Sequence, residues 1–122
     1  LYCLSCILEC LMTVSAASAN DLVDLVRLFA GYLRFYQVPR AESDIADFLG
    51  ERLQRGDAQL FIARDAQGVA QGFVQLYPLF SSLALEPAWL LSDLYVDEAF
   101  RRAGVGEALM NAARRPAARR PS

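Results

Sequence analysis

The chain has no histidine and no lysine, and its three cysteines all lie within the first ten residues. The missing residue types exclude Schiff-base chemistry, histidine general bases and histidine metal ligands. Cys3 and Cys6 form a C-x-x-C pair, but no second pair of metal-ligating residues accompanies it. We therefore interpret the pair as part of an apolar lead segment and predict no metal site. Because the rest of the chain has no cysteine, we expect a cytoplasmic protein.

Positive charge is scarce outside the C-terminal end. Four of the twelve arginines lie in the last nine residues, which leaves eight arginines against fourteen acidic residues in the rest of the chain. An acidic body predicts no nucleic-acid partner, because nucleic-acid binding needs a basic surface. With 55% hydrophobic and 21% charged residues, the composition is typical of one globular domain.

The first nineteen residues are apolar, and the Ala-Ser-Ala sequence that ends this stretch resembles a signal-peptide cleavage site. The stretch lacks a positive start and carries Glu9 in its apolar part, which disfavours both a signal peptide and a membrane span. We therefore predict no membrane partner, a natural start at Met12 and a non-native leader over 1–11. Export directed by the first nineteen residues is the alternative.

A second change of composition occurs at Pro116. Proline lacks the backbone N–H that a helix needs, so we predict that the last helix stops before this residue. Residues 116–122 consist of arginine, alanine, proline and serine. They predict a flexible basic tail, either natural or produced by a shifted reading frame.

Two amphipathic helices are predicted in the first half of the chain. Ser18 and Asp21 have the spacing of a capping box, and a helix that ends near Gln37 follows them. Its apolar stripe consists of Leu22, Leu25, Val26, Phe29 and Leu33. A second helix is predicted over 43–54, and Gly56 behind it is the residue that closes it. Its apolar face consists of Ile45, Phe48, Leu49 and Leu53.

Four strands are predicted, over 13–16, 58–64, 69–77 and 89–96. The loop with Gly68 has the length of a hairpin turn, so the second and third strands are expected to pair antiparallel. Pro78 is predicted to end the third strand. The link behind Pro78 is expected to be partly buried because of its apolar residues, which are Leu79, Phe80, Leu83 and Leu85.

A last helix is predicted to begin at Gly104, since apolar residues repeat at helical spacing behind it. They are Val105, Ala108, Leu109 and Ala112. The order of elements predicts one α/β (α+β) domain over 12–115, with a mixed, mostly antiparallel sheet flanked by helices.

The strand over 89–96 joins this helix through a turn that contains Gly104 and Gly106. Unpaired N–H groups at a helix start and the helix dipole attract anions, and glycines let the backbone approach a ligand closely. Arg101 and Arg102 add charged donors at the same place. The G-x-G spacing alone also fits a plain tight joint between strand and helix. It lacks the lysine of a Walker loop and the third glycine of a Rossmann fingerprint.

With its flanks, this segment resembles the signature of the GNAT N-acetyltransferases. That signature is R/Q-x-x-G-x-G/A, preceded by a strand that ends in an apolar-aromatic-valine run. Here it reads Arg101-x-x-Gly104-x-Gly106, after Leu94-Tyr95-Val96. The helices and the hairpin upstream follow the order of elements in this family, so the resemblance covers nearly the whole predicted domain.

The resemblance implies acetyl-CoA as cosubstrate and an amine of a small molecule or protein as acceptor. Main-chain groups of Leu94, Tyr95 and Val96 would bind the pantetheine arm like an added strand, and an amide near Leu94 would polarise the thioester oxygen. Amides of the following loop would bind the diphosphate, and Arg101 would brace that loop. The loop residues with this role are Arg102, Ala103, Gly104, Val105 and Gly106.

Three further side chains are candidates for the acceptor site. Asp93 directly precedes the pantetheine-binding run and is predicted to hold a cationic amine or relay its proton; the alternative is a partly solvated carboxylate at a strand end. Tyr77 and Trp89 are candidate walls of the acceptor site, or else ordinary core aromatics.

In the family, the helix that begins at the glycine loop is followed by further strands, which this sequence does not contain. The resemblance therefore predicts a truncated domain with missing C-terminal strands, impaired catalysis and an open sheet edge, through which a homodimer can form. The alternative to an enzyme is a non-catalytic module that binds CoA or phosphate, or that binds another chain through its edge strand.

Overall fold

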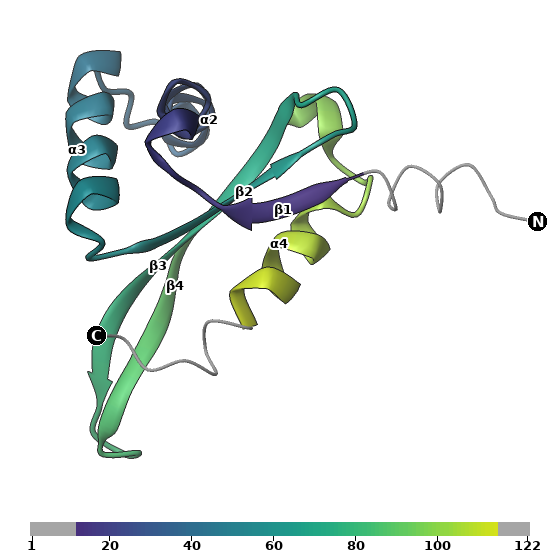
Figure 1. Cartoon of the computed structure of the whole chain (residues 1–122). Helices are drawn as coiled ribbons and strands as arrows, with labels where there is room; N and C mark the ends of the chain where they lie inside the picture. The colour runs from purple at the N-terminus through teal and green to yellow at the C-terminus, as the bar shows by residue number, and fades with distance from the viewer. Residues whose placement is uncertain (1–11, 115–122) are drawn as a thin grey trace, which may run out of the picture.

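The computed structural model describes residues 12–114 (Figure 1). Its strands are Thr13–Ala16 (β1), Gln59–Arg64 (β2), Ala70–Ser81 (β3) and Glu86–Val96 (β4). Its α-helices are Leu22–Phe35 (α2), Glu42–Arg55 (α3) and Val105–Arg114 (α4), and its 3-10 turns are Ala19–Asp21 (η1) and Glu98–Phe100 (η2). The leader predicted over 1–11, with its C-x-x-C pair, and the tail predicted over 116–122 lie outside the described residues.

The strands form one antiparallel sheet in the order β1-β2-β3-β4. Helices α2 and α3 cover one face of it, and α4 covers the other (Figure 1). Side chains alternate along β3: Phe73 joins Leu25 and Leu49 in the core under α2 and α3, whereas Val74 joins Leu109 in the core under α4. The predicted mixed fold with a mostly antiparallel sheet is confirmed.

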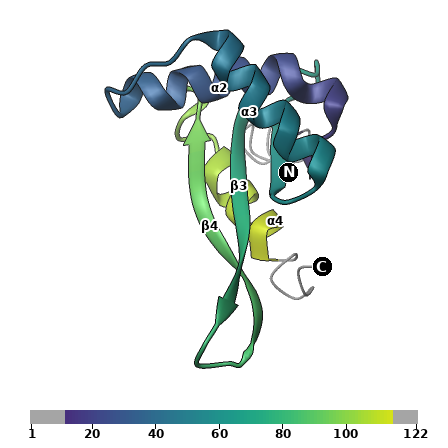
Figure 2. The same cartoon turned by 90° about the vertical axis from the view of Figure 1, so that its left-hand side faces the viewer.

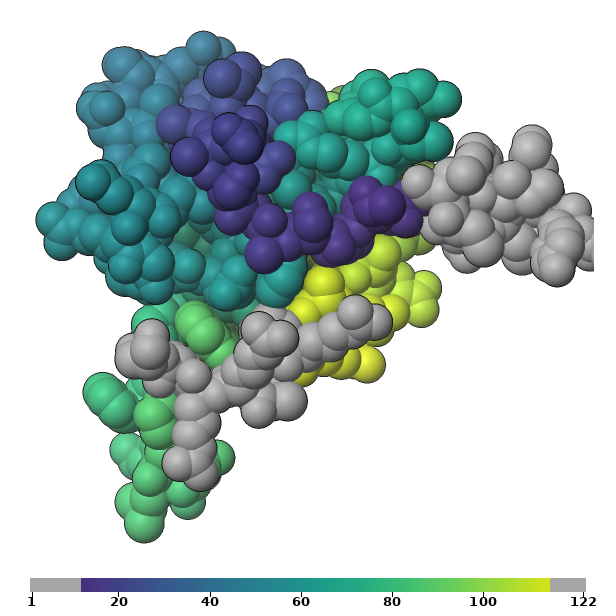
Figure 3. Space-filling view, viewed as in Figure 1, coloured from purple at the N-terminus to yellow at the C-terminus, as the bar shows by residue number. Residues whose placement is uncertain are grey.

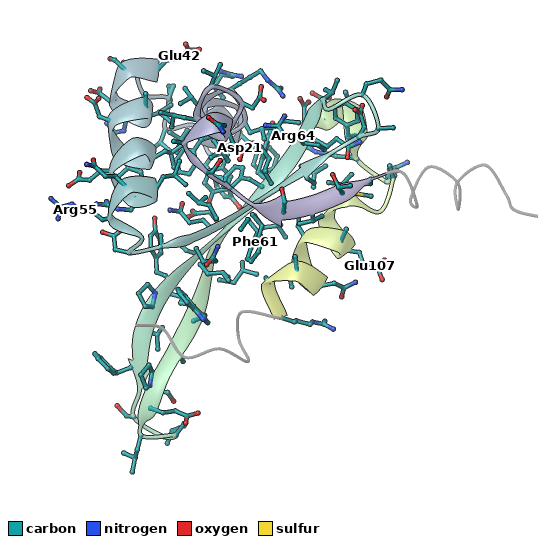
Figure 4. All side chains as sticks on the ribbon, in the orientation of Figure 1. Asp21, Glu42, Arg55, Phe61, Arg64 and Glu107 are labelled. Atoms are coloured by element: carbon teal, nitrogen blue, oxygen red, sulfur yellow. The ribbon has the colours of Figure 1, made fainter. Side chains whose placement is uncertain are left out.

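An ion-pair network ties the start of α2 to β2. The amide of Ser18 donates to Asp21 Oδ2 at 2.9 Å, as the capping-box spacing predicts. Arg64 on β2 donates to Asp21 Oδ1 at 2.7 Å and to Asp24 Oδ2 at 2.8 Å. Figure 4 labels Asp21 and Arg64 on these two elements. Burial alone would raise the pKa of Asp21, but the hydrogen bonds from Arg64 and Ser18 outweigh it and hold this pKa below its ordinary value.

Asp21→Asn is expected to lower the free energy of unfolding by about 1 kcal/mol at neutral pH, because Arg64 loses a partly buried charged acceptor. A carboxyl whose pKa folding depresses contributes stability above its unfolded pKa, and this contribution is lost as pH falls through the folded value. The difference between the two proteins should therefore disappear at acidic pH, which urea unfolding at a series of pH values measures. If Asp21→Asn and the wild type were equally stable at neutral pH, the ion pair between Asp21 and Arg64 would not stabilise the fold as described.

Strands β3 and β4 continue into the segment predicted as a link and form a hairpin that extends beyond the helices (Figures 2 and 3). Strand β3 continues through Pro78 to Ser81, so the predicted end at Pro78 is wrong. Pairing of β3 with β2 stops at Leu76, and the free side of the strand beyond that point tolerates a proline. The expectation of a partly buried link is also wrong, since Phe80 is 84% exposed and Leu83 is 101% exposed.

Helix α3 begins and ends within one residue of its predicted bounds, but one predicted core position differs. Ile45 and Leu49 are buried as expected, whereas Phe48 stays 39% exposed. The Phe48 ring lies 6.4 Å from that of Phe29 and 5.0 Å from the guanidinium of Arg52. Phe48 therefore lies at the edge of the core, between helix α2 and solvent.

Candidate functional site

Strand β4 is one of the two edge strands of the sheet within residues 12–114, and β1 is the other. Leu94 and Tyr95 pair with Val74 and Phe73 on β3, and the other side of β4 has no strand neighbour in this part of the chain. Outer N–H and C=O groups of an edge strand can pair with another extended chain. The structure thus presents the run that ends at Val96 in the form that an extended ligand requires.

A bulge interrupts the β3–β4 pairing next to this run. Gln75 pairs with Asp93, but the next residue, Leu76, pairs with Leu91, so Ser92 is the extra residue on β4. A bulge bends its strand and re-aims the side chains beside it. Both Ser92 and Asp93 line a pocket between the sheet and the helices α2 and α3.

Arg101 holds the loop between β4 and α4. Its guanidinium lies 5.6 Å from the ring centroid of Phe35 and 5.7 Å from that of Tyr95. Its Nε donates to the carbonyl oxygen of Val96 at 3.1 Å. Cation–π contacts of this kind stabilise a guanidinium in one orientation. Arg101 therefore joins the loop to the end of β4 and to the last residue of α2.

Within residues 12–114, the first amides of α4 have no main-chain hydrogen-bond partner. The amide of Ala108 donates to the carbonyl of Gly104 at 3.0 Å. The three amides before Ala108 precede the regular bonding pattern of the helix and have no partner within it. Arg102 and Gly104 have φ values of 68° and 83°, and the left-handed conformation costs a non-glycine residue about 1–2 kcal/mol. Turns of this kind direct neighbouring amides into one concave surface, which attracts anions.

Asp93 is held by a tyrosine that the sequence analysis did not single out. Tyr32 on α2 donates to Asp93 Oδ1 at 2.7 Å. Burial and this hydrogen bond raise the pKa of Tyr32 above its ordinary value, so the phenol keeps its proton at neutral pH. Burial and the negative charge of Asp93 also raise the pKa of Tyr77. Asp93 is therefore an oriented carboxylate with one oxygen engaged by the protein.

The pocket beside Asp93 has a volume of about 360 Å³. Its apolar walls come from Phe29, Leu33, Ile45, Phe48 and Tyr77. Its polar lining consists of Arg40, Asp44, Ser92 and Asp93. Tyr77 lines this pocket, whereas Trp89 packs with the core under α4, on the other face of the sheet. The prediction of Trp89 as a second wall is therefore wrong, and its alternative as a core aromatic holds.

Two further properties concern the same described range. Residues 12–114 contain no group of three or more His, Cys, Asp or Glu side chains that could hold a metal ion. In this range no helix combines the length and the apolar character that crossing a membrane requires. The polar groups gathered around β4 are carboxylate, phenol, guanidinium and main-chain amide groups.

Comparison with known families decides the assignment. Residues 56–121 match the family model described as an acetyltransferase (GNAT) domain. The chain belongs to the GNAT acetyltransferase family. The match contains β2, β3, β4 and α4, and so includes the edge strand and the loop with unpaired amides.

Two relatives and one solved structure resemble this GNAT chain over most of its length. The uncharacterized N-acetyltransferase YhfO of Bacillus subtilis is 33% identical over 103 residues, which are 84% of this chain and 68% of that protein. A probable acetyltransferase of Haemophilus influenzae is 36% identical over 91 residues, which are 74% of this chain and 62% of that protein. The crystal structure of a probable acetyltransferase, 34% identical, superposes with a TM-score of 0.82 and covers 87% of this chain and 71% of that one.

Proposed function

We propose that this GNAT chain transfers an acetyl group from acetyl-CoA to an amine of a small molecule or protein. The observation that carries the proposal is the arrangement of an open edge strand, Arg101 and the unpaired amides before Ala108 along one continuous segment. The family match supports the reaction type, and the acetyltransferase names of the similar proteins agree with it.

The residues present fit the chemistry of acetyl-CoA. A diphosphate needs several converging donors, and the amides from Arg102 to Gly106 lie where two left-handed residues shape a concave backbone. The exposed guanidinium of Arg102 adds positive charge. An extended pantetheine arm needs N–H and C=O groups along one side of a strand, and the outer side of the run from Leu94 to Val96 would supply them, apart from the carbonyl of Val96 that already accepts from Arg101.

In the proposed reaction, the neutral nitrogen of the acceptor attacks the carbonyl carbon of the thioester. A C–N bond forms, the C–S bond breaks, and the sulfur leaves as a thiolate. Counted from its ammonium form, the acceptor loses two protons, of which one reaches the thiolate and the other passes to solvent. We assign Asp93 to hold the ammonium before it loses its proton, while Tyr32 fixes the carboxylate.

The proposal is tested by incubating the full chain with acetyl-CoA and a panel of amines. Mass spectrometry then measures which amines become acetylated. We expect one class of amine to become acetylated at a rate proportional to the concentration of the chain. Failure of every amine to react, together with no acetyl-CoA binding by calorimetry, would contradict the proposal.

We also propose a cytoplasmic location, because the chain beyond its first ten residues has no cysteine.

The open side of β4 favours a second candidate, which is a non-catalytic module. Such a module would bind CoA without transferring its acetyl group, or would pair through β4 with another chain, including a second copy of itself. Acetyl-CoA binding without any acetylated product would favour this candidate. Analytical ultracentrifugation measures whether two copies associate.

A further inference from the structure

Phe35, the last residue of α2, has a large apolar side chain that the core does not cover. The residue is 63% exposed. Its ring lies 5.2 Å from that of Tyr36, its neighbour in the chain, and 5.6 Å from the guanidinium of Arg101. A single exposed aromatic residue needs no explanation by itself. Phe35 differs because one of its contacts is the arginine that joins the loop between β4 and α4 to the rest of the fold.

The guanidinium of Arg101 lies near two aromatic rings. Besides Phe35, the ring of Tyr95 on β4 lies 5.7 Å from it, and its Nε donates to the carbonyl oxygen of Val96 at 3.1 Å. Within residues 12–114, no carboxylate forms an ion pair with Arg101. A cation is attracted to an aromatic ring whose centroid lies within about 6 Å. The two rings therefore orient a guanidinium that no acidic side chain of this range fixes.

The last turns of α2 also contact the strand that leads to this loop. A Cβ added at Gly31 would lie 2.7 Å from Tyr95 Oη, so the Tyr95 side chain lies against the backbone of α2. The next residue, Tyr32, donates to Asp93 Oδ1 at 2.7 Å. Figure 2 shows this end of β4 beside α2. The end of α2 thus contacts the carboxylate proposed to hold the acceptor and, through Phe35, the loop proposed to bind the cosubstrate.

We propose that Phe35 is a positioning residue for the cosubstrate site. Its ring holds the guanidinium of Arg101, and Arg101 holds the loop whose amides receive the diphosphate in the proposed function. Without the ring, binding of the diphosphate has to order the Arg101 side chain as well, and ordering a long side chain costs conformational entropy. This inference rests on the proposed function and adds to the cosubstrate site a residue of α2 that lies outside the motif.

Calorimetric titration of the full chain with acetyl-CoA tests this inference. Phe35→Leu keeps an apolar side chain but removes the aromatic ring, and it should weaken acetyl-CoA binding about threefold. Phe35→Tyr keeps a ring and should bind acetyl-CoA as the wild type does. Because Phe35 is largely exposed, the thermal midpoints of both variants should stay close to that of the wild type.

Phe80→Leu is the matched control for the loss of an exposed ring. Phe80 is 84% exposed on the β3–β4 hairpin, and within residues 12–114 no guanidinium lies over its ring. The same substitution there should leave the acetyl-CoA affinity unchanged. A loss of affinity in Phe80→Leu equal to that in Phe35→Leu would show that the effect does not depend on Arg101, and would overturn the inference.

A double-mutant cycle separates positioning through Arg101 from a general structural role. Arg101→Gln removes the guanidinium, so Phe35→Leu should cause no further loss of acetyl-CoA affinity in that background. A further threefold loss there, roughly the same as in the wild-type background, would contradict the inference. Phe35→Tyr binding as weakly as Phe35→Leu would also contradict it, since a ring would then not be what matters.

The outcomes separate this inference from the proposed function. If the chain acetylates an amine and Phe35→Leu binds acetyl-CoA as tightly as the wild type, the inference fails while the proposed function stands. If Phe35→Leu weakens acetyl-CoA binding as expected but no amine becomes acetylated, the proposed transfer fails. The role of Phe35 in positioning the cosubstrate loop then stands.

Discussion

The Gly104→Ala variant is expected to bind acetyl-CoA about tenfold more weakly than the wild type, a loss of about 1.4 kcal/mol. Gly104 has a φ of 83°, which an L-residue adopts only at a cost, so the alanine shifts the turn that directs the amides before Ala108. Loss of one well-directed donor to a charged diphosphate costs an amount of this size. Calorimetric titration with acetyl-CoA measures the change.

Gly68→Ala is the matched control for this variant. Gly68 has a φ of 84° in the turn between β2 and β3, and an added Cβ there would meet nothing within 4 Å. Both variants therefore carry the same backbone cost and should lose similar stability, by about 1 kcal/mol. Only Gly104→Ala should lose affinity for acetyl-CoA. Equal affinities of the two variants would show that the turn at Gly104 does not shape the cosubstrate site.

The Gly72→Ala variant is expected to lose roughly 1–3 kcal/mol of unfolding free energy. This is the largest loss of stability that we predict for the addition of one methyl group. A Cβ at Gly72 would lie 2.6 Å from the carbonyl oxygen of Tyr95 and 3.2 Å from both Val96 Cα and Leu109 Cδ1. Because two of these atoms belong to the backbone of β4, that strand has to move. Urea unfolding measures the loss.

Gly50→Ala provides a control of opposite sign. The Cβ added at Gly50 would meet only Leu22 Cδ2, at an ordinary contact distance of 3.7 Å. Gly50 lies inside α3, where alanine favours the helix over glycine by about 0.5–1 kcal/mol. This variant should therefore be slightly more stable than the wild type. A destabilised Gly50→Ala, or a Gly72→Ala as stable as the wild type, would contradict the packing described for the two faces of the sheet.

The helices and the first hairpin could be predicted because their signals are local. The capping pair Ser18 and Asp21 and the apolar period behind it determine the start of α2, and Gly56 determines the end of α3. The length of the β3–β4 hairpin could not be predicted, because it depends on pairing between β3 and β4 rather than on either strand alone. Pro78 indicated an end of the strand. However, β3 no longer pairs with β2 beyond Leu76, so a proline there removes no hydrogen bond to β2 and the strand continues.

The two halves of the candidate site differed in the same way. The segment proposed to bind the cosubstrate lies in one continuous stretch, so a motif could predict it. The bond between Tyr32 and Asp93 joins residues 61 positions apart, and no local pattern indicates it.

The central claim is that the amides at the start of α4 receive the diphosphate of acetyl-CoA while the edge of β4 receives its extended arm. Titration of isotopically labelled chain with coenzyme A, followed by the backbone amide resonances in NMR spectra, tests it directly. The account predicts progressive shifts for resonances from Leu94 to Glu107 and none for Gly56 or Gly68, which lie in other turns. A well-folded sample in which the resonances from Leu94 to Glu107 do not move would contradict it.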